Sequence, residues 1–139
     1  MLAKHRAQWT HADLLSVARL IIDPASNGGM HADGLTAEYV AAQLPMSPCL
    51  AMFDDVGTAA FVVGLWPYDR MPTGTMRGVL HVAGDGRVPD AWRIVRGFLA
   101  SLPDVEVFSL TPSPALARLA RRAGLDMLGQ EAGHLILGR

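Results

Sequence analysis

The sequence has one cysteine, few charged side chains and no long apolar run, and each absence excludes a class of protein. The single cysteine, Cys49, excludes an internal disulfide and a metal site built from several thiolates. Only 18% of the residues are charged and the formal net charge is −1, so no basic excess exists to neutralise phosphates, and we expect no nucleic-acid partner. The longest strongly apolar run, about residues 59–66, is too short to cross a bilayer, so we expect no membrane insertion.

Common catalytic and targeting motifs are also missing. The chain has no Gly-x-Ser-x-Gly, no Gly-x-x-x-x-Gly-Lys-Ser/Thr and no Gly-x-Gly-x-x-Gly motif. The first residues, MLAKHRAQWTHADLL, lack the apolar core of a signal peptide, which predicts a soluble, cytoplasmic protein. The histidines are not spaced as metal ligands, so no metal site is predicted from them: His5, His11, His31, His81 and His134.

What the chain does contain is the composition of an ordered globular protein. Half of its 139 residues are hydrophobic, and we expect a single domain over residues 1–139. Thr10 and Asp13 have the spacing of a helix capping box, and the apolar residues that follow recur at helical spacing, which predicts a helix over residues 10–22. A second helix is predicted over residues 36–44.

From residue 48 the pattern changes to that of strands. Residues 49–53 and 59–66 predict a β-hairpin with a short acidic turn, and a loop is expected over residues 67–75. The later predicted elements, in chain order, are a strand over 76–83, a helix over 91–101, a strand over 105–110, a helix from Pro114 to Gly124, and strands over 125–129 and 134–138. This order predicts an α/β (α+β) fold, a three-layer sandwich in which a mixed central sheet has helices on both faces.

The C-terminal third resembles a known family. Its stretch SPALARLARRAGLDMLGQ reads as a helix that ends at Gly124-Leu125 and is followed by a strand. Together with the strand, turn, helix and strand before it, this order resembles the core of the GNAT acetyltransferase superfamily, whose last helix ends in a Gly-Phe pair. The resemblance implies a GNAT-like fold over most of the chain. A helix that ends in glycine before a strand is common, so the pair also fits a plain helix C-cap.

The resemblance maps the turn that holds the pyrophosphate of acetyl-CoA onto this chain. The family has Arg or Gln, two residues, Gly, one residue, and Gly or Ala, whereas this sequence has Arg87, Asp90 and Trp92 at those places. The pyrophosphate is bound by backbone amides at a helix N-terminus, and glycine permits its close approach. Asp90 can instead cap the helix and would repel the pyrophosphate. The residues implied to border the cofactor are Val82, Gly86, Arg87, Val88, Asp90, Ala91 and Trp92.

An alternative alignment through Gly84 and Gly86 supplies two glycines but places them before the helix, which fits less well. The family's acid–base residues are also sparse. The family often has a tyrosine on the last helix that protonates the leaving thiolate, and the corresponding position here is about Ala120, which has no proton to donate. His81 lies on the central strand, where the resemblance implies a catalytic base, and histidine can accept a proton near neutral pH. A lone histidine on a central strand is more often a structural residue.

Three further groups have open interpretations. His31 and Asp33 lie in a glycine-rich loop that borders the acceptor site in the family, although a hydrated loop explains them better. One aromatic and methionine-containing group fits an interaction surface or packing over the end of the sheet equally well: Trp66, Tyr68, Met71 and Pro72. One basic group on the last helix is expected to form a solvated face: Arg118, Arg121 and Arg122.

Two functions follow from the resemblance and the altered turn. The first is a GNAT-like protein without ordinary acetyltransferase activity, a structural or binding component with a protein partner or self-association and no cofactor. The chain resembles short GNAT-like proteins of tailed phages, so the structural role includes that of a component of a phage particle. The alternative is an active N-acyltransferase that uses acetyl-CoA and a small-molecule amine, with the backbone of residues 86–92 and Arg87 at the pyrophosphate and His81 or an ordered water as base. A ligand sensor without turnover is a third possibility.

Overall fold

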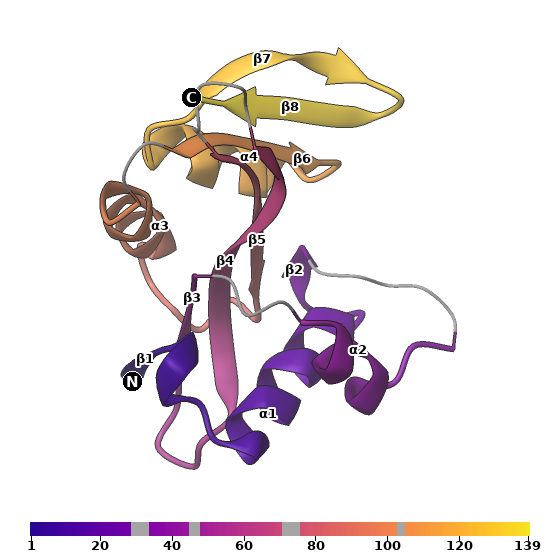
Figure 1. The fold of residues 1–139 in the computed structure, drawn as a ribbon, viewed down its shortest axis with the longest axis vertical. Helices are drawn as coiled ribbons and strands as arrows, with labels where there is room; N and C mark the ends of the chain where they lie inside the picture. The colour runs from indigo at the N-terminus through magenta and orange to yellow at the C-terminus, as the bar shows by residue number, and fades with distance from the viewer. Residues whose placement is uncertain (29–33, 45–47, 71–75, 103–104) are drawn as a thin grey trace. The chain divides into compact units, whose positions relative to one another are not determined.

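The computed structural model describes residues 1–28, 34–44, 48–70, 76–102 and 105–139 (Figure 1). The chain forms two compact units. One unit contains residues 1–64 and 81–89, and the other contains residues 65–80 and 90–139.

The described strands form a mixed sheet with the order β1-β3-β4-β5-β6-β8-β7, and β2 pairs with β5 beside this path. Strands β4 (Ala59–Arg70) and β5 (Met76–Gly84) contribute residues to both units. Four α-helices occur among the described residues, α1 and α2 in the first unit and α3 and α4 in the second. A mixed sheet combined with helices confirms the predicted α/β fold class.

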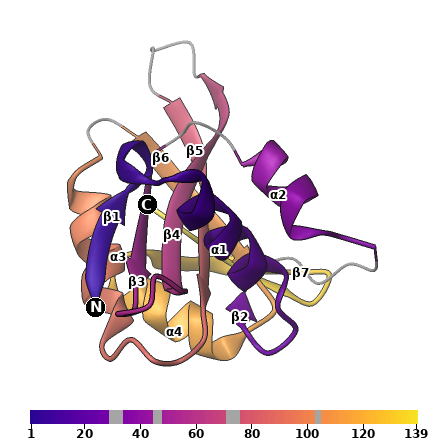
Figure 2. The ribbon, with the colours of Figure 1, turned by 90° about the horizontal axis from the view of Figure 1, so that it is seen from below.

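The first unit has three antiparallel strands side by side, as Figures 1 and 2 show from two directions. Strand β1 (Leu2–His5) pairs with β3 (Cys49–Phe53), and β3 pairs with residues 59–64 of β4. On β5, the last two residues pair with the short strand β2 (Asn27–Gly28). The predicted hairpin is therefore confirmed, with an additional strand on its outer side.

The turn of this hairpin is closed by Asp54. The carboxylate Oδ1 of Asp54 accepts the backbone N–H of Val56 at 3.0 Å and that of Thr58 at 2.8 Å. The N–H of Asp54 donates to the Thr58 carbonyl at 2.9 Å. Gly57 has a φ of +83°, a left-handed conformation that glycine adopts without steric cost. A short acidic side chain that binds its own turn is the reason aspartate favours such positions.

Helix α1 (His11–Ile22) begins with the predicted capping box. The Thr10 hydroxyl accepts the Asp13 N–H at 3.1 Å, and the Asp13 carboxylate accepts the Thr10 N–H at 3.0 Å. Asp13 also accepts a hydrogen bond from Lys4 Nζ at 3.0 Å, which joins the helix start to β1. The Thr10 amide, followed by the Lys4 ammonium, holds the pKa of Asp13 below its usual value against the opposing effect of burial.

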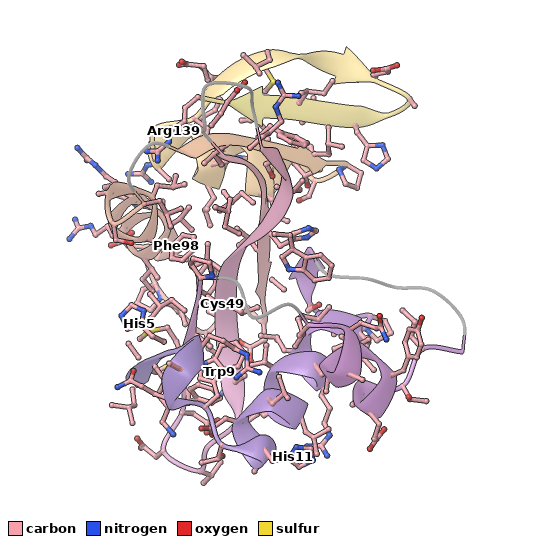
Figure 3. The ribbon with its side chains drawn as sticks, in the orientation of Figure 1. His5, Trp9, His11, Cys49, Phe98 and Arg139 are labelled. Carbon is pink, nitrogen blue, oxygen red and sulfur yellow. The ribbon has the colours of Figure 1, made fainter. Side chains whose placement is uncertain are left out.

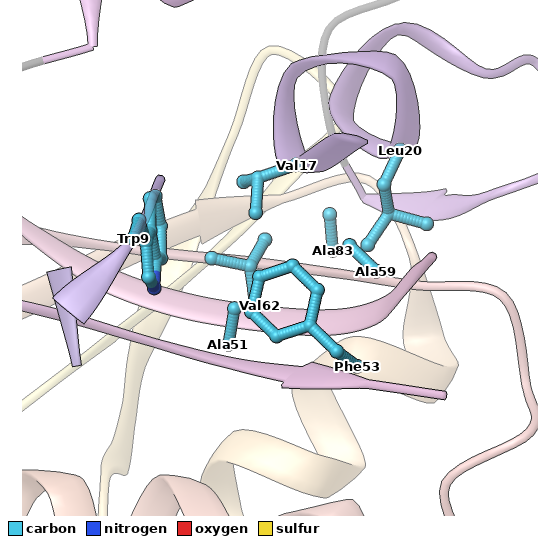
Figure 4. Close-up of a cluster of buried hydrophobic side chains, with 8 residues drawn as sticks. All are labelled: Trp9, Val17, Leu20, Ala51, Phe53, Ala59, Val62 and Ala83. Carbon is cyan, nitrogen blue, oxygen red and sulfur yellow. The ribbon is translucent and has the colours of Figure 1, made fainter. Parts of the chain in front are cut away.

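A cluster of buried apolar side chains lies between α1 and the strands of this unit (Figure 4). The Trp9 ring meets the Phe53 ring edge-on, with centroids 6.4 Å apart, and its Nε1–H donates to the Lys4 carbonyl at 3.0 Å. The cluster consists of Trp9, Val17, Leu20, Ala51, Phe53, Ala59, Val62 and Ala83. A smaller cluster on another side of α1 packs against helix α2 (Ala37–Gln43) through Ala18, Ala37, Val40 and Ala41.

In the second unit, β5 pairs in parallel with β6 (Val105–Thr111), but the register covers only residues 76–79 and 105–108. Strand β6 pairs antiparallel with β8 (His134–Gly138), and β8 pairs antiparallel with β7 (Asp126–Glu131) at the end of the strand order. A parallel pair needs a crossover connection, and helix α3 supplies it between β5 and β6.

Helices α3 (Ala91–Ala100) and α4 (Pro114–Arg122) pack against each other. Helix α4 begins as predicted, because the Ser113 hydroxyl accepts the Leu116 N–H at 3.3 Å and Pro114 fills the first helical position. At the C-terminus of the chain, the Arg139 guanidinium donates to the Leu99 carbonyl at 3.0 Å (Figure 3). This bond fixes the last residue of the chain to the end of α3.

Some elements differ from the prediction. The sequence pattern predicts neither β1 nor β2 nor the short 3-10 helix η1 (Arg6–Gln8), because these segments are short and lack alternating apolar residues. Strand β4 continues to Arg70, whereas a loop is predicted from residue 67 onward. The backbone there remains extended although Pro67 and polar residues follow Trp66, which shows that extended structure does not require a β-prone sequence.

One buried hydrogen bond joins α1 to the sheet, and its removal is expected to destabilise the protein. The Ser16 hydroxyl, on a residue only 9% exposed, accepts the Ala59 N–H at 2.8 Å. Because Ser16→Ala leaves that buried amide without a partner, we expect the free energy of unfolding to fall by about 1–3 kcal/mol. Denaturant unfolding of the variant measures this. Ser101→Ala is the control, because Ser101 is exposed and water can replace its hydroxyl. Equal losses in both variants would contradict the prediction.

Candidate functional site

The loop that follows β5 is organised by Asp85, Gly86 and Arg87. Asp85 Oδ1 accepts the backbone N–H of Arg87 at 3.0 Å, which closes a tight turn around Gly86. Gly86 has a φ of +88°, a left-handed conformation that favours glycine. The N–H of Asp85 donates to the Ala60 carbonyl at 3.1 Å, so the loop starts from a fixed position on β4.

The Arg87 guanidinium is bonded to two carboxylates. Its Nε–H donates to Asp85 Oδ2 at 2.7 Å and its Nη1–H donates to Asp54 Oδ2 at 2.7 Å. Asp54 already closes the β3–β4 turn, so a single arginine joins that turn to the loop after β5. We call Asp54, Asp85 and Arg87 the arginine clasp. Short bonds between a guanidinium and carboxylates are among the stronger hydrogen bonds in proteins.

The clasp shifts the titration of Asp54 and of Arg87. The bond from Arg87, followed by the amide of Thr58, holds the pKa of Asp54 below its usual value. The carboxylate of Asp54, followed by that of Asp85, raises the pKa of Arg87 above its usual value. The resemblance implies that Arg87 faces the cofactor pyrophosphate. In this structure the positive charge of Arg87 is already balanced by protein carboxylates.

Helix α3 begins in an unusual way. Asp90 is its N-cap residue with φ +50° and ψ +43°, and its side chain makes no capping hydrogen bond. The expectation that the Asp90 side chain caps the helix is therefore wrong, because a capping residue normally has extended backbone angles and Asp90 is left-handed. Left-handed angles favour glycine, the residue that the resemblance implies at this place. The Asp90 carboxylate is exposed at the start of α3.

The Trp92 side chain lies in the first turn of α3 beneath two guanidinium groups. The Arg122 guanidinium lies 4.6 Å from the Trp92 ring centroid and that of Arg93 lies 5.3 Å from it. The indole Nε1 of Trp92 is buried and has no hydrogen-bond partner within the part of the chain that the structure describes. These contacts stabilise the cations over the ring face. Half-buried side chains complete the predicted set: Val82, Val88 and Ala91.

His81 lies on β5, one residue before Val82, and its residue is exposed. Protein atoms around the imidazole desolvate it and lower its pKa below the usual value. A lowered pKa makes the neutral imidazole the dominant form at pH 7, and the neutral form can accept a proton. His81 and the clasp belong to the first unit, whereas Asp90, Ala91 and Trp92 belong to the second.

The last helix ends as the Gly124-Leu125 pair predicts. The Leu125 N–H donates to the Ala120 carbonyl at 3.1 Å and the Gly124 N–H donates to the Arg121 carbonyl at 3.1 Å, with Gly124 at φ +113°. These two bonds form a Schellman motif, so the plain C-cap interpretation accounts for the pair fully. Ala120 is 5% exposed and faces the protein interior. The resemblance puts the family's tyrosine at about this position, and alanine has no proton to donate.

Other candidates from the sequence add no chemistry. His31, Asp33, Met71 and Pro72 lie outside the described residues. Burial raises the pKa of the Cys49 thiol to about 11, so it is protonated and a poor nucleophile at pH 7. No group of three or more His, Cys, Asp or Glu side chains gathers within the described ranges, and His5 and His11 lie apart in Figure 3.

No helix in the part of the chain that the structure describes is long and apolar enough to span a membrane.

The sequence interpretation missed Asp54 and Asp85, the partners of Arg87. Asp85 carried a local signal, because Asp-Gly before a charged residue is typical of a turn closed by the aspartate side chain. Asp54 is 33 residues from Arg87 and is brought to it only by the pairing of strands. No sequence pattern at Asp54 points to that contact.

Comparisons with known proteins identify the fold. No protein-family model matches the chain, and no curated protein matches it in sequence. Solved structures do match. The GNAT-superfamily phosphinothricin acetyltransferase of Sinorhizobium meliloti, solved in complex with AcCoA, has a TM-score of 0.70 and 14% identity over 100% of this chain and 88% of that chain. The ribosomal-protein-alanine N-acetyltransferase of Brucella melitensis has a TM-score of 0.69 and 17% identity over 100% and 99%. A GNAT-family acetyltransferase of Streptococcus pneumoniae has a TM-score of 0.66 and 14% identity over 99% and 98%. At these identities the likeness shows the fold.

The clasp predicts a pH dependence of stability. Because the pKa of Asp54 is lower in the folded state, its contribution is fully present above the ordinary carboxyl pKa of 3.8 and is lost as the pH falls through the lower folded value. Arg87→Gln removes the cation, so we expect its melting temperature to lie below that of the unmodified protein at pH 7. The difference should shrink below about pH 4.

Thermal unfolding monitored by circular dichroism between pH 7 and pH 2.5 measures this difference. Arg19→Gln is the matched control, because Arg19 is an exposed arginine on α1 that makes no ion pair with the described residues. A difference for Arg87→Gln that stays constant down to the lowest pH would show that Asp54 is not the partner that matters.

Proposed function

We propose that this chain, which has the fold of the GNAT acetyltransferases, acts as a binding component and does not transfer acetyl groups by the ordinary route of that superfamily. The observation that carries the proposal is the start of α3, where the left-handed N-cap residue is Asp90, at the position to which the resemblance maps the first glycine of the pyrophosphate turn. Three further features of the residues around this turn and on α4 support it.

The Asp90 backbone supports the mapping of this position onto a glycine. Its φ of +50° lies in the region that favours glycine, so the turn keeps a glycine-like backbone while it carries a carboxylate. A helix N-terminus attracts anions through its unpaired amides and its dipole. The Asp90 carboxylate at the same place opposes that attraction, because like charges repel.

The residues present therefore do not fit the pyrophosphate of acetyl-CoA well. Trp92 fills the first turn of α3 with an indole ring that lies beneath the Arg93 and Arg122 guanidinium groups. Arg87, which the resemblance implies is the cation at the pyrophosphate, is bonded to Asp54 and Asp85. A ligand phosphate would have to compete with two carboxylates at 2.7 Å for that guanidinium.

The acid–base residues also suit a protein without transfer activity. Ala120 on α4 has no proton to donate to a leaving thiolate. His81 is a neutral imidazole at pH 7 and can accept a proton. A general base is not enough for acetyl transfer, because the reaction also needs a bound cofactor.

A second candidate function is an N-acyltransferase with an atypical turn, acting on a small-molecule amine. Two observations favour it. The Asp90 side chain leaves the first amides of α3 without a side-chain cap, and the Sinorhizobium meliloti neighbour was solved in complex with AcCoA. In this version Val82, Gly86, Arg87, Val88, Ala91 and the α3 amides would border the cofactor, and His81 would be the base.

As a binding component, the protein would bind a protein partner or a second copy of the chain. A place in a phage particle is one form of this role, supported by the resemblance to short GNAT-like proteins of tailed phages with altered cofactor turns. The alternative location is the cytoplasm. Size-exclusion chromatography with light scattering separates self-association from the need for a foreign partner.

The decisive experiment is calorimetric titration of acetyl-CoA and CoA into the unmodified protein and into two variants. Asp90→Gly removes the carboxylate and suits the left-handed backbone, and Asp90→Asn removes the charge while it keeps the size of the side chain. We expect no binding by the unmodified protein and a gain of binding in Asp90→Gly. A partial gain in Asp90→Asn would separate the effect of charge from that of bulk.

Micromolar binding of acetyl-CoA by the unmodified protein would contradict the binding-component proposal and would favour the acyltransferase. Acetyl transfer to a panel of small amines, followed with a thiol reagent that detects released CoA, would then test that candidate. Failure of all three proteins to bind would show that Asp90 alone does not account for the loss of cofactor binding.

A further inference from the structure

The charges of the second unit are divided between its helices and its last three strands. Helices α3 and α4 carry five arginines and no acidic residue. Strands β6, β7 and β8 carry three carboxylates and neither lysine nor arginine. Glu106 is paired with Arg77 of β5 at 3.7 Å. Asp126 and Glu131 are exposed and form no ion pair within the described ranges, so the unbalanced negative charge of these strands lies on β7.

Strands β6, β8 and β7 lie side by side at one end of the strand order (Figure 1). Residues directly opposite in an antiparallel pair lie on the same face, and neighbours along a strand alternate between the two faces. One face carries Val107 and Leu137, which are 1% and 0% exposed, and α4 contacts both β6 and β8. The other face carries two rows of opposite residues: Phe108, Gly138 and Asp126 in one row, and Leu110, Ile136 and Gly129 in the next.

This second face is apolar and open to solvent. Leu110 is 53% exposed and Leu128 is 64% exposed. A Cβ added at Gly138 would meet Leu128 Cδ1 at 2.8 Å, which places Leu128 on the same face as Gly138. Contiguous exposed apolar side chains on a protein surface are found where partners bind. We call the following residues the apolar sheet face: Phe108, Leu110, Leu128 and Ile136.

The two carboxylates of β7 lie at the two ends of this face. Asp126 is opposite Gly138 and Glu131 is opposite His134, which are the last and first residues of β8. Since each step along a strand adds about 3.4 Å, the two ends are separated by about 14 Å. The first and fifth side chains of an extended peptide lie on one side at the same spacing. The face therefore matches an extended segment with a basic residue at each end and an apolar residue between them.

Charge and area decide which kind of partner fits. A second copy that used the same face would bring the Asp126 and Glu131 carboxylates of both copies together, and like charges across a contact repel. The face is also small. Three strands about 4.8 Å apart and about 17 Å long cover on the order of 250 Å², against about 800 Å² per partner in a standard stable interface. A short segment of another protein satisfies both constraints.

We propose that the apolar sheet face binds an extended segment of a partner protein in which an apolar side chain lies between two basic ones. The basic side chains lie beside Asp126 and Glu131, and the apolar side chain packs on Leu110 and Leu128. This inference names the chemistry of the partner in the proposed binding role and rests on that role. It uses residues of β6, β7 and β8 and none of the turn before α3.

Backbone amide NMR of the isotope-labelled, unmodified protein tests the proposal. The probe is a synthetic peptide with capped ends and the sequence lysine, threonine, leucine, threonine, lysine. The control peptide has glutamate in place of each lysine. We expect the lysine peptide to cause saturable shift changes in residues 106–111 and 126–138. The glutamate peptide should bind about tenfold more weakly or not at all, because its charges repel those of β7.

The apolar part of the contact is tested with the double variant Leu110→Thr and Leu128→Thr. Threonine keeps the preference for strands while it removes the exposed apolar groups. The matched control is Leu2→Thr with Val56→Thr, which removes two exposed apolar side chains from the first unit. We expect the test variant to bind the lysine peptide about tenfold more weakly and the control to bind it within about twofold of the unmodified protein. Unchanged amide shifts elsewhere in each spectrum show that the variants fold.

The charged part is tested with Asp126→Asn and Glu131→Gln in one protein. The matched control is Glu38→Gln with Asp55→Asn, which removes the same charge from exposed positions of the first unit. We expect the test variant to bind the lysine peptide about fivefold more weakly at low ionic strength, and the difference to shrink when salt is added. The control should bind as the unmodified protein does.

Four results would overturn the proposal. They are the absence of saturable shift changes, changes confined to other residues, equal weakening in a test variant and its control, and equal binding of the two peptides. Shift changes at residues 126–138 that depend on protein concentration without peptide would assign the face to a second copy and would also overturn it. The acetyl-CoA titration stays a separate test. Peptide binding together with acetyl-CoA binding would contradict the proposed function alone, and the absence of both would contradict this inference alone.

Discussion

The hydrogen bonds from one guanidinium to two carboxylates set the conformation of the loop between β5 and α3. Arg87 joins Asp85, which closes the loop after β5, to Asp54, which closes the β3–β4 turn. Isolated surface ion pairs contribute little to stability, partly because forming them costs side-chain entropy. Here the two carboxylates are already held by backbone amides, so the network with the guanidinium costs less side-chain entropy. Without Arg87, two negative charges would be left close together. The hairpin turn and the loop are therefore coupled although they are distant in the sequence.

This coupling constrains what the loop can do. An arginine that balances two protein carboxylates exerts a weaker field on a ligand than a free arginine would. At the start of α3, the Asp90 side chain makes no bond to the helix amides, so these amides have no side-chain cap. The Asp90 carboxylate also adds a negative charge to the same end of the helix. Each feature by itself weakens the attraction of its own surroundings for an anion. The fold alone does not establish the activity, because the same backbone can carry different charges at the place where a ligand binds.

The sequence predicts the parts of the fold that local chemistry determines. The capping box at Thr10, the serine and proline that start α4, and the glycine that ends it each satisfy backbone groups within a few residues, and all are confirmed. The sequence does not predict the pairing of the polar strand β1 or the bond between Asp54 and Arg87, because both depend on segments far apart in the chain. At Asp90 the residue type suggests a side-chain cap. The left-handed backbone prevents it, and one sequence does not reveal that angle.

The net charge, like the residue type at Asp90, predicts less than the structure shows. A net charge of −1 excludes a uniformly basic protein, and this exclusion holds for the chain as a whole. It does not describe the distribution, since acidic residues are absent from α3 and α4 while five arginines are present. Within a Debye length of about 8 Å at physiological ionic strength, a ligand responds to the charges near it and not to the sum over the molecule. The spacing of Arg118, Arg121 and Arg122 on one helix could be predicted from the sequence. The contact of Arg122 with the Trp92 ring follows only from the packing of α3 against α4.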